Sequence, residues 1–439
     1  MAAAAETKVL IIGGGGREDA LLWSLRKSPL VGEIFMAPGN GGTERFPDTR
    51  RIHLDPSDIA QIVQAASDLQ AELVVVGPEN PLILGVADRL RAKEIAVYGP
   101  GAAGANLEGS KADAVQFMRE FGIPHPPTVT FGDFTSAAVF ANNTSWWGKG
   151  GIVIKADGPA GGKGVFVCGN RDEAREALEK IMVRKEFGDS GERVVIQERI
   201  KGYEVSVMAI VSGDSYILLP PSEDHKTIFD QDAGPNTGGM GVLAPHPLVN
   251  GDVGWQIEEA IIKRTLNGLE KRGINFRGTL YPGIMVTPQG PVVLEYNARF
   301  GDPETEAIIS LLERDLFPVL QEAAAGKALS DCGCPVKDGY CVTVTLAAGG
   351  YPDKYEKGKE IFGLKTIRGR DDVVVFHAGT SRREDGTYES SGGRVLMVTG
   401  IGDSIENARE KAYGAIGPAG IHFDGMRYRQ DIGARKRKI

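Results

Sequence analysis

Four consecutive glycines, residues 13–16, follow a short aliphatic run near the start of the chain. Residues 9–12 are aliphatic and mostly β-branched, which predicts a strand buried on both faces of a parallel sheet. Apolar residues then recur at helical spacing over residues 20–25. A strand that turns through glycine into a helix leaves backbone N–H groups free, and the helix dipole favours an anion beside them. The sequence therefore predicts an α/β fold with an anion-binding turn; an ordinary tight turn is the alternative.

This turn does not match a dinucleotide site. In the pattern G-x-G-x-x-G that starts at Gly13, the third glycine would fall on Glu18. The next apolar stretch, residues 33–42, lacks the acidic residue that would bind a ribose 2′-hydroxyl, and it ends in a second glycine-rich loop. A phosphate pocket is therefore favoured over an NAD pocket.

Length and charge narrow the class of protein. A chain of 439 residues suggests about two to four domains. The net charge of −8 argues against a general nucleic-acid or membrane-surface role, and no apolar run is long enough to cross a bilayer. Residues 1–6 lack the apolar segment of a secretory signal, and we interpret the basic residues 435–438 as a solvated end. Cys332 and Cys334 have the wrong spacing for a zinc pair. A cytoplasmic enzyme is expected.

The order of elements predicts several parts. Strands and helices alternate over the first hundred residues, which predicts an open parallel sheet with the loops 13–16, 39–42 and 77–81 at its carboxyl edge. Ser110 is a predicted N-cap for the helical run that follows it. A proline-rich hinge then leads to a small subdomain and a β-rich segment. A linker at 331–339 leads to a C-terminal β/α unit.

Two stretches of the middle segment suggest a nucleotide site. Lys155 ends an expected strand, and residues 158–164 form a glycine-rich turn that carries Lys163. Such a hairpin can cover a polyphosphate with backbone N–H groups and a point charge; a plain hairpin with a surface lysine is the alternative. Further on, a strand breaks at Gly202 and resumes with Glu204. A connector of this kind can hold adenine and ribose, although a solvated glutamate is the alternative reading.

The strongest local signal lies in residues 292–306. Period-2 alternation puts Glu295, Asn297 and Arg299 on one face of an expected strand. A carboxylate and an amide oxygen two residues apart suit Mg²⁺ that also touches phosphates. Arg299 can then reach a γ-phosphate or an anionic intermediate. An edge strand that faces water is the alternative.

Two loops before this strand carry further polar groups. Residues 220–226 contain Asp224, His225 and Lys226, and residues 232–241 are too rich in glycine and asparagine for regular structure. Such loops order around anions. His225 is either a base or a hydrogen-bonding contact, and His377 has the same ambiguity.

A series of short motifs resembles the phosphoribosylamine–glycine ligase family of the ATP-grasp superfamily. In chain order they are GGGGRE, APGNGGT, VVVGPENPL, LEGSKA, KADGPAGGKGV, EDHK, GPNTGGMG, EYNARFGDPE, AAGGYP and FHAGT. They cover nearly the whole chain, and several are not shared with other ATP-grasp enzymes.

The resemblance implies an α/β architecture in three domains. Residues 1–107 would form an N-terminal open parallel sheet of the preATP-grasp type, and residues 329–439 a C-terminal β/α domain. Between them, residues 108–328 would form an ATP-grasp clamp with a small mobile lid subdomain at about 128–196. The implied reaction joins glycine to 5-phosphoribosylamine with ATP and Mg²⁺ or Mn²⁺, through glycyl phosphate, as the second step of purine synthesis.

The resemblance also implies roles for single residues. The ATP phosphates would meet Lys111, Lys155, Lys163 and Asn236, the adenine would meet Gln197, Glu198, Arg199 and Ile200, and the ribose would meet Glu204. Metal would bind Glu295 and Asn297, and the catalytic candidates are Arg299, Asp224, His225 and Lys226. The 5-phosphoribosylamine site would be bordered by Gly15, Asn40, Gly41 and Pro78, with Gly301 and Asp302 as candidates for glycine or amine contacts.

Three departures from the family pattern bear on substrate binding rather than on reaction class. The family usually reads GREHA where this chain has Asp19, which would either weaken the anion pocket or point into solvent. In the lid, Pro159 and Gly161 replace the usual leucine and alanine. Thr227 follows DHK where a basic residue is usual, which removes one nucleotide-phosphate contact.

Two other functions stay open. One is an ATP-grasp ligase with a different carboxylate and amine, against which GPNTGGMG and FHAGT argue. The other is a catalytically silent nucleotide-binding protein, which the intact metal strand disfavours. The expected partners are small-molecule substrates, with no nucleic acid and no membrane, and the expected state is a monomer or homodimer.

Overall fold

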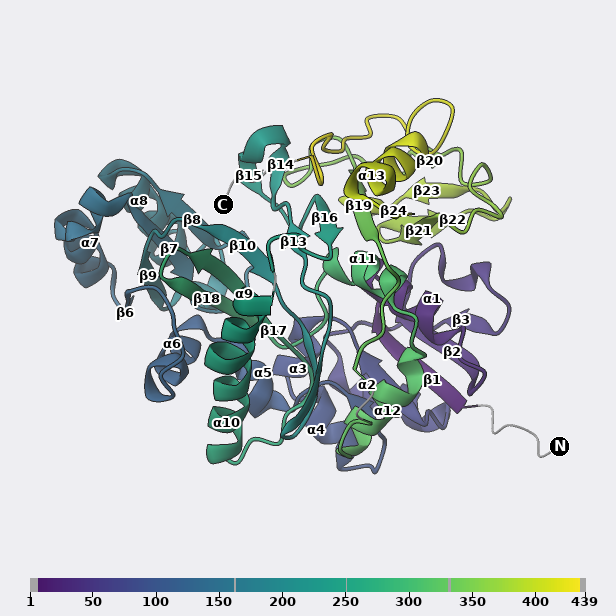
Figure 1. Cartoon of the computed structure of the whole chain (residues 1–439), viewed down its shortest axis with the longest axis horizontal. Helices are drawn as coiled ribbons and strands as arrows, with labels where there is room; N and C mark the ends of the chain where they lie inside the picture. The colour runs from purple at the N-terminus through teal and green to yellow at the C-terminus, as the bar shows by residue number, and fades with distance from the viewer. Residues whose placement is uncertain (1–6, 162, 250, 331–332, 435–439) are drawn as a thin grey trace.

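The computed structural model describes residues 7–161, 163–249, 251–330 and 333–434. The expectations for residues 1–6, for Cys332 and for residues 435–438 lie outside this part. A small lid lies at one end of the molecule, and the N-terminal and C-terminal domains lie together at the other (Figure 1). Within the described residues, no helix is long and apolar enough to span a membrane.

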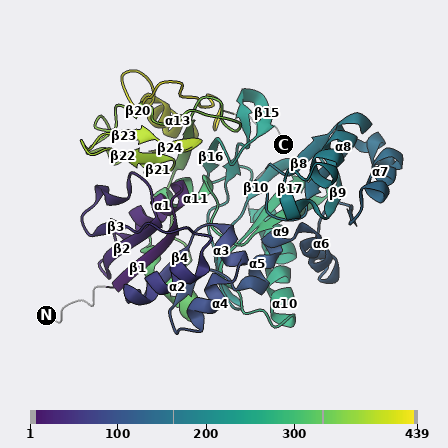
Figure 2. The same ribbon diagram turned by 180° about the vertical axis from the view of Figure 1, so that it is seen from behind.

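The N-terminal domain is the parallel sheet that the sequence predicts. Its order is β3-β2-β1-β4-β5, and all its pairs are parallel (Figure 2). The strands are β1 (Thr7–Gly13), β2 (Val31–Pro38), β3 (Thr49–Arg51), β4 (Leu73–Val76) and β5 (Val97–Tyr98). The helices are α1 (Gly16–Leu25), α2 (Ile59–Asp68), α3 (Glu79–Ile83), α4 (Val86–Arg91) and α5 (Ala102–Gly109). The strand order reverses beside β1, so the glycine loop lies at the switch point where α/β sheets bind ligands.

The lid is a four-stranded antiparallel sheet in the order β6-β9-β7-β8. Its strands are β6 (Thr128–Phe131), β7 (Ile152–Ala156), β8 (Val165–Cys168) and β9 (Val194–Glu198), and its helices are α7 (Phe134–Asn143) and α8 (Arg171–Leu178). The helix α6 (Lys111–Glu120) leads into it, and the Ser110 side chain accepts from Asp113 N, which confirms the predicted N-cap.

The central sheet carries the predicted metal strand. It is built from β10 (Tyr203–Ser206), β11 (Ala209–Ser212), β12 (Ser215–Leu218), β17 (Arg277–Thr287) and β18 (Gly290–Asn297). The helices α9 (Gly251–Ile257) and α10 (Lys263–Lys271) follow each other through a π-helical turn, and α9 packs against β18. A separate hairpin is formed by β14 (Thr227–Phe229) and β15 (Ala233–Asn236).

The C-terminal sheet includes strands from the middle of the chain. Its order is β13-β16-β19-β24-β21, and every pair is antiparallel. The strands are β13 (Glu223–Asp224), β16 (Gly241–Ala244), β19 (Tyr340–Ala347), β21 (Val373–His377) and β24 (Arg394–Gly402), and α13 (Ile405–Gly414) packs on β24. A smaller sheet holds β20 (Glu360–Ile361), β22 (Thr380–Arg382) and β23 (Tyr388–Ser390). The motifs around Asp224 and Met240 are therefore held by the C-terminal sheet.

The helix α11 (Glu304–Leu311) lies where the domains meet. All eight of its residues are buried, and it packs against α1, β16, β19 and β24. The next helix, α12 (Leu316–Ala325), packs against β5 and β11. One hydrophobic core therefore runs from the N-terminal sheet through α11 to Phe376 and Met397 of the C-terminal sheet.

Candidate active site

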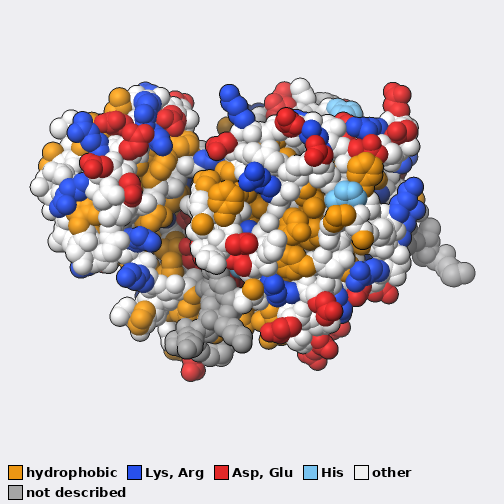
Figure 3. All heavy atoms as spheres, turned by 90° about the horizontal axis from the view of Figure 1, so that it is seen from above, with side chains coloured by type: hydrophobic (Ala, Val, Ile, Leu, Met, Phe, Trp, Pro, Cys, Tyr) orange, Lys and Arg blue, Asp and Glu red, His pale blue; other side chains and the backbone are white. Residues whose placement is uncertain are grey.

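A cavity of about 800 Å³ lies between the lid and the rest of the molecule. From above, the lid appears as a lobe separated by a notch from the larger body (Figure 3). The cavity is lined by the lid, the central sheet, the N-terminal domain through Arg17 and Glu79, and the C-terminal domain through Arg394. The predicted residues that line it are Lys111, Lys155, Gln197, Glu198, Arg199, Ile200, Glu204, Asp224, Lys226, Asn236, Glu295, Asn297, Arg299 and Asp302.

A β-bulge in β18 aims the predicted metal ligands into this cavity. Glu295 is opposite Gly283 on β17, and Val293 is opposite Ile284, so Leu294 is the extra residue of the bulge. Glu295 and Asn297 face the cavity together with Leu294, as the period-2 alternation predicts for the two polar residues. The Leu294 carbonyl accepts a hydrogen bond of 2.9 Å from Lys155 Nζ, so the bulge also anchors this lysine.

Three lysines converge on Glu295. Burial by itself would raise the pKa of this carboxyl, but Lys226, Lys155 and Lys111 outweigh burial and lower it to about 2. Lys226 Nζ lies 3.9 Å from Glu295 Oε1 and 3.0 Å from Glu204 Oε2, and Glu204 is the main cause that raises the Lys226 pKa. Burial lowers the pKa of Lys155 to about 8. Three lysine side chains around one ionised carboxylate are suited to binding a polyphosphate.

The donor set fits Mg²⁺ that is shared with a phosphate chain. Glu295 and Asn297 supply one carboxylate and one amide oxygen, and the amide Oδ1 now accepts from Arg299 Nη2 at 3.0 Å. Among the described residues no cluster of three or more His, Cys, Asp or Glu side chains could hold a metal alone. Mg²⁺ typically binds one or two protein oxygens and takes its other ligands from phosphates and water, so two protein ligands suffice.

Arg299 lies beyond the end of β18, which stops at Asn297, so the expectation that it continues the strand is wrong. Its Nη2 is 2.9 Å from Glu108 Oε1, its Nε is 3.4 Å from Glu79 Oε2, and its Nη1 donates to the Phe300 carbonyl at 3.2 Å. Burial opposes the charge, but Glu108 and Glu79 raise the Arg299 pKa. The guanidinium lines the cavity but is held by carboxylates from two other motifs.

The EDHK motif places its side chains on two faces. Asp224 and Lys226 line the cavity, while the His225 ring is buried beside Glu223, with Nε2 3.7 Å from Glu223 Oε1. Glu223 also lies 3.8 Å from His246 Nε2. Of the two roles expected for His225, the base that acts in the cavity is therefore not supported. Alternation along the backbone turns the ring away from the cavity and toward Glu223 of β13, as a contact residue would lie.

The cavity also holds a group of acidic side chains. Asp224 Oδ1 has no hydrogen-bond partner among the described residues, and burial, reinforced by Glu304, raises the Asp224 pKa. Glu304 accepts from Tyr281 Oη and from Ser206 Oγ, and Asp302 lies nearby beside Arg394. Gly301 is not among the lining residues, and its N contacts Met208 Sδ at 3.3 Å. An unpartnered buried carboxylate calls for a donor such as an ammonium group.

The residues expected to meet adenine lie along strands of the lid and the 197–202 connector. Val153, Val165 and Val167 of the lid and Met285 of β17 line the cavity beside Gln197–Ile200. Glu198 is ion-paired with Lys149 at 3.1 Å rather than free. An apolar slot beside backbone groups at a strand end is suited to a flat base.

Lys163 lies away from this cavity. Its Nζ donates to the Pro352 carbonyl of the C-terminal domain at 3.1 Å. Pro159 and Gly161 of the same turn line the cavity, and the Pro159 carbonyl accepts from Ser190 Oγ. In this structure the turn therefore contributes backbone to the cavity, and the expectation that Lys163 faces it is not met.

The residues expected to border the sugar-phosphate site lie together at the carboxyl edge of the N-terminal sheet, but their polar groups bond within the protein. Asn40 Nδ2 donates to the Gly14 and His377 carbonyls at 3.1 and 2.8 Å, and Gly41 N donates to the Thr380 carbonyl. Pro78 is the N-cap residue of α3.

The glycine turn at the start of α1 is occupied by the protein's own carboxylates. Gly15 N donates to Glu18 Oε2 at 2.6 Å, and Arg17 N donates to Asp302 Oδ2 at 3.5 Å. This corrects the expectation of free N–H groups at Gly15: the anion at this helix N-terminus is a glutamate three residues on, in a capping box.

Asp19 neither points into solvent nor faces the turn as a free charge. It is fully buried, and its two oxygens accept from Arg45 Nη1 and Nη2 at 2.6 and 2.8 Å. Its Oδ2 also accepts from His377 N at 2.9 Å. Thr227, the other polar departure, accepts a hydrogen bond of 2.8 Å from the buried Arg429. Both departures are therefore paired with arginines from elsewhere in the fold.

Several residues that line the cavity have no role predicted from the sequence. These are Arg17, Glu79, Glu108, Tyr281 and Arg394, whereas Glu304, which also lines it, belongs to the GDPE loop that is a candidate for glycine or amine contacts. Arg17, Glu79 and Glu108 lie inside motifs of the family pattern, so their polar character at a motif was an available signal. Arg394 had no such signal, because only the fold brings it to the site.

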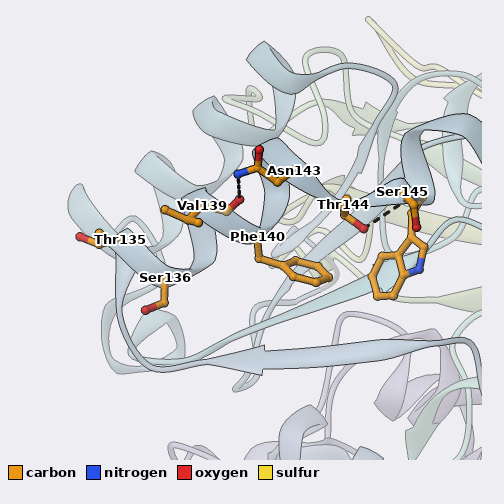
Figure 4. Close-up of a pocket in the computed structure, with 8 residues that line it drawn as sticks. Thr135, Ser136, Val139, Phe140, Asn143, Thr144 and Ser145 are labelled. Atoms are coloured by element: carbon orange, nitrogen blue, oxygen red, sulfur yellow. Dashed lines mark hydrogen bonds between the residues drawn. The ribbon is translucent and has the colours of Figure 1, made fainter.

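A second hollow lies on the outer side of the lid, along α7 (Figure 4). It is lined by Val139, Phe140 and Trp146 with small polar residues, and the hydrogen bonds drawn there are local, such as Asn143 Nδ2 to the Val139 carbonyl. It contains no predicted site residue, and its shape is open and shallow.

Comparison with known proteins identifies the three domains. Models of the N, ATP-grasp (A) and C domains of phosphoribosylglycinamide synthetase match residues 7–108, 109–305 and 341–435. The chain is 44% identical to phosphoribosylamine–glycine ligase of Synechocystis, over 97% of this chain and 99% of that protein. It is 42% identical to a trifunctional purine biosynthetic protein of Gallus gallus, over 98% of this chain but only 42% of the longer protein. It likewise spans 53% of a bifunctional purine biosynthetic protein of Schizosaccharomyces pombe.

Solved structures agree with this assignment. A phosphoribosylamine–glycine ligase of Thermotoga maritima superposes with a TM-score of 0.84 at 35% identity, over 97% of this chain and all of that chain. A biotin carboxylase domain of Hydrogenobacter thermophilus, at 17% identity and a TM-score of 0.72 over 96% of this chain and 91% of that chain, shares the fold. Domain models, relatives and fold all agree, and the chain belongs to the phosphoribosylglycinamide synthetase family of ATP-grasp enzymes.

Proposed function

We propose that this protein is an ATP-dependent ligase that joins glycine to 5-phosphoribosylamine and forms glycinamide ribonucleotide, ADP and phosphate. The observation that carries the proposal is one cavity that holds two groups of side chains: Glu295 and Asn297 beside three lysines, and Asp224 with Asp302. The first group suits a polyphosphate with its cation, and the second suits an amine or ammonium group.

In the proposed reaction, the glycine carboxylate attacks the γ-phosphate to give glycyl phosphate and ADP. The amine of 5-phosphoribosylamine then attacks the acyl carbon, and phosphate leaves. Lys111, Lys155 and Lys226, with Asn236, would hold the phosphate chain, and Gln197 to Ile200 with Glu204 would hold the nucleoside. Glu295 and Asn297 would hold Mg²⁺ or Mn²⁺, which supplies charge neutralisation when bound.

Arg299 and Asp224 would act on the transferred groups. The guanidinium, fixed by Glu108 and Glu79, provides a preorganised positive charge beside the metal ligands. The unpartnered Asp224 oxygen would accept from the glycine ammonium, and Asp302 would border the amine site. Enclosure by the lid would keep water from the acyl phosphate. Small-molecule substrates, a cytoplasmic location, and a monomer or homodimer complete the proposal.

The test is coupled ADP release with ATP, glycine and freshly made 5-phosphoribosylamine, with each omitted in turn. ADP formation that requires all three supports the proposal. A panel of other amino acids tests the second candidate, a ligase for a different carboxylate, and activity with another amino acid but none with glycine would favour it. ATP binding without any substrate-dependent ADP release would favour a silent nucleotide-binding protein.

A further inference from the structure

Arg394 brings the C-terminal domain into the cavity. It is the first residue of β24, and its side chain is 19% exposed and lines the cavity near Asp224 and Asp302. Nothing in its local sequence marks it as a site residue.

The Arg394 guanidinium joins two active-site loops. Its Nη1 donates to the carbonyls of Gly238 and of Asp302, the latter at 2.8 Å, and its Nη2 lies 3.1 Å from Asp302 Oδ1. A Cβ on Gly238 would stand 2.9 Å from the guanidinium carbon, so the loop passes directly over the arginine. The planar fork therefore holds the 236–240 loop and the 301–303 loop in one arrangement.

Through Asp302, this arrangement reaches the N-terminal domain. The other Asp302 oxygen, Oδ2, accepts from Arg17 N at 3.5 Å and lies 2.9 Å from the point where a Cβ on Gly15 would stand. The C-terminal domain also makes a second contact with the 236–240 loop, because Gly238 N donates to Tyr351 Oη at 3.0 Å. Asp302 is thus held at the meeting point of all three domains.

Arg394 also supplies a positive charge to these acidic side chains. Burial raises the pKa values of Asp224 and Glu306; Lys226 and Arg394 oppose the rise at Asp224, and Arg394 opposes it at Glu306. Burial opposes the Arg394 charge in turn, but Asp302, Tyr351, Glu306 and Asp224 together raise its pKa. A neutral residue at 394 would leave several buried carboxyls without their shared counter-ion.

We propose that Arg394 is a positioning residue of the ligase, which fixes the Asp302 carboxylate and the 236–240 loop where the amine-bearing substrates bind. The C-terminal domain thereby completes the active site. This inference rests on the proposed function for its substrates, but the contacts that carry it do not depend on which amine is joined.

The kinetic test compares Arg394→Met and Arg394→Lys with Arg383→Met as the matched control. Arg383 is an arginine of the same domain that pairs with Glu389 at 2.7 Å and does not line the cavity. For Arg394→Met we expect the KM for glycine or for 5-phosphoribosylamine to rise about tenfold or more, while the Kd for ATP, to which this loop contributes only Asn236, rises less. Arg394→Lys keeps the positive charge but not the planar guanidinium, and we expect its KM to rise less than that of Arg394→Met.

A double variant tests the route through Asp302. If Arg394 acts by holding Asp302, the double variant Arg394→Met with Asp302→Asn should raise the substrate KM little more than the single variant with the larger effect does. Fully additive losses, or unchanged substrate KM values in Arg394→Met, would overturn the proposal.

A readout without turnover separates this inference from the proposed function. Hydrogen exchange measured on Arg394→Met should speed up in peptides that cover 236–240 and 301–303, and should not change in the lid or in the Arg383→Met control. Unchanged exchange in those two loops overturns the inference even if the ligase activity is confirmed. Faster exchange in a protein that lacks the ligase activity supports the loop-fixing role and refutes only the proposed substrates. Should Arg394→Met fail to fold, Arg394→Lys carries the same measurements.

Discussion

Asp19 shows how a single unusual residue can be absorbed by the fold around it. The family pattern has histidine there, and the sequence offered two outcomes, a weakened anion pocket or a solvent-facing side chain. In the structure the carboxylate is buried and accepts two hydrogen bonds from the Arg45 guanidinium, which also donates to the Gly42 carbonyl at 2.8 Å. The pair therefore fixes the 39–45 loop against α1, and its charges cancel locally.

Replacing Asp19 by the histidine of the family pattern should be destabilising in this chain. Asp19→His leaves the Arg45 guanidinium buried beside an imidazole, and we expect a loss of about 3–5 kcal/mol in the free energy of unfolding. Urea denaturation measures it. Asp19→His with Arg45→Leu removes both charges and should recover most of the loss. No recovery in the double variant would contradict the pairing, and Arg50→Leu, from an exposed pair with Glu33, is the control.

Glu295 differs from Asp19, because its proposed role is to bind a metal ion rather than to pair with a single arginine of the fold. We expect Glu295→Ala to abolish turnover while the fold survives, since the proposed metal would lose its one carboxylate ligand. Coupled ADP release measures the turnover, and circular dichroism measures whether the fold survives. Glu259→Ala, a change on an exposed helical face, should leave both readouts unchanged, and near-normal activity in Glu295→Ala would refute the metal assignment.

Residues of the site differed in how far the sequence could place them. Glu295 and Asn297 were accessible because two-residue alternation along one strand is a local property. Arg394 was not, because it meets its partners only through contacts between segments far apart in the chain. The two expected roles of His225 could not be separated, because a short strand with no clear apolar pattern gives no sign of which face each residue takes.

At the scale of elements, a bulge and a strand end explain why period-2 alternation did not predict the course of the chain after Val293. The sequence predicted one strand through residues 292–299, whereas β18 contains a bulge at Leu294 and stops at Asn297. The bulge turns the Leu294 carbonyl toward Lys155, and the strand end releases Arg299 toward Glu108. Neither feature has a composition signal in this stretch, because no glycine or proline marks it.

The junction between the lid and α6 depends on one carboxylate. Asp157, just after β7, accepts from Ala112 N at 2.7 Å and from Ser110 Oγ, and it pairs with Arg193 at 2.7 Å. The Asp157 and Gly158 carbonyls also accept from Lys111 Nζ. This contact therefore sets a predicted phosphate-binding lysine at the start of α6.

We expect Asp157→Asn to lower the free energy of unfolding by about 1.5–3 kcal/mol, because charge-assisted hydrogen bonds to Arg193 and to the α6 N-terminus are lost. The Kd for ATP should rise as well, since Lys111 loses its support. Denaturation and calorimetry measure these effects. Asp133→Asn, at the exposed N-cap of α7, is the matched control, since asparagine caps as well as aspartate. Equal effects of the two changes would argue against a special role for Asp157.

At the scale of the whole molecule, the N-terminal and C-terminal domains are joined by a polar and aromatic interface. Asn40 donates to the His377 carbonyl, and Trp23 of α1 meets Phe376 of β21 edge-on at 5.7 Å. His377 is buried there against Gly42 and Tyr388, with Nδ1 3.1 Å from Thr380 Oγ1. The sequence predicted both domains but could not show that they share one core.

This interface predicts sensitivity to acid. Burial, with the nearby Arg45 charge, lowers the pKa of His377 to about 3, although Asp19 opposes the shift. The unfolded chain takes up this proton below about pH 6.5 and the folded chain does not, so stability falls as pH drops from 6.5 toward 3. The loss is up to about 1.4 kcal/mol per pH unit. Urea titrations at stepped pH should show a shallower slope for His377→Gln than for wild type or His53→Gln. Equal slopes in all three would rule out His377 as the source.

The burial of α11 on every side also bears on how the chain is made. The face of α1 (Gly16–Leu25) packs against α11 (Glu304–Leu311) and β21 (Val373–His377), which follow it by about 285 and 350 residues and leave the ribosome that much later. At about 5–20 residues per second, α1 waits roughly 20–70 s for its covering partners. During that interval the nascent N-terminal sheet carries an uncovered apolar flank, which is the kind of surface that chaperones bind.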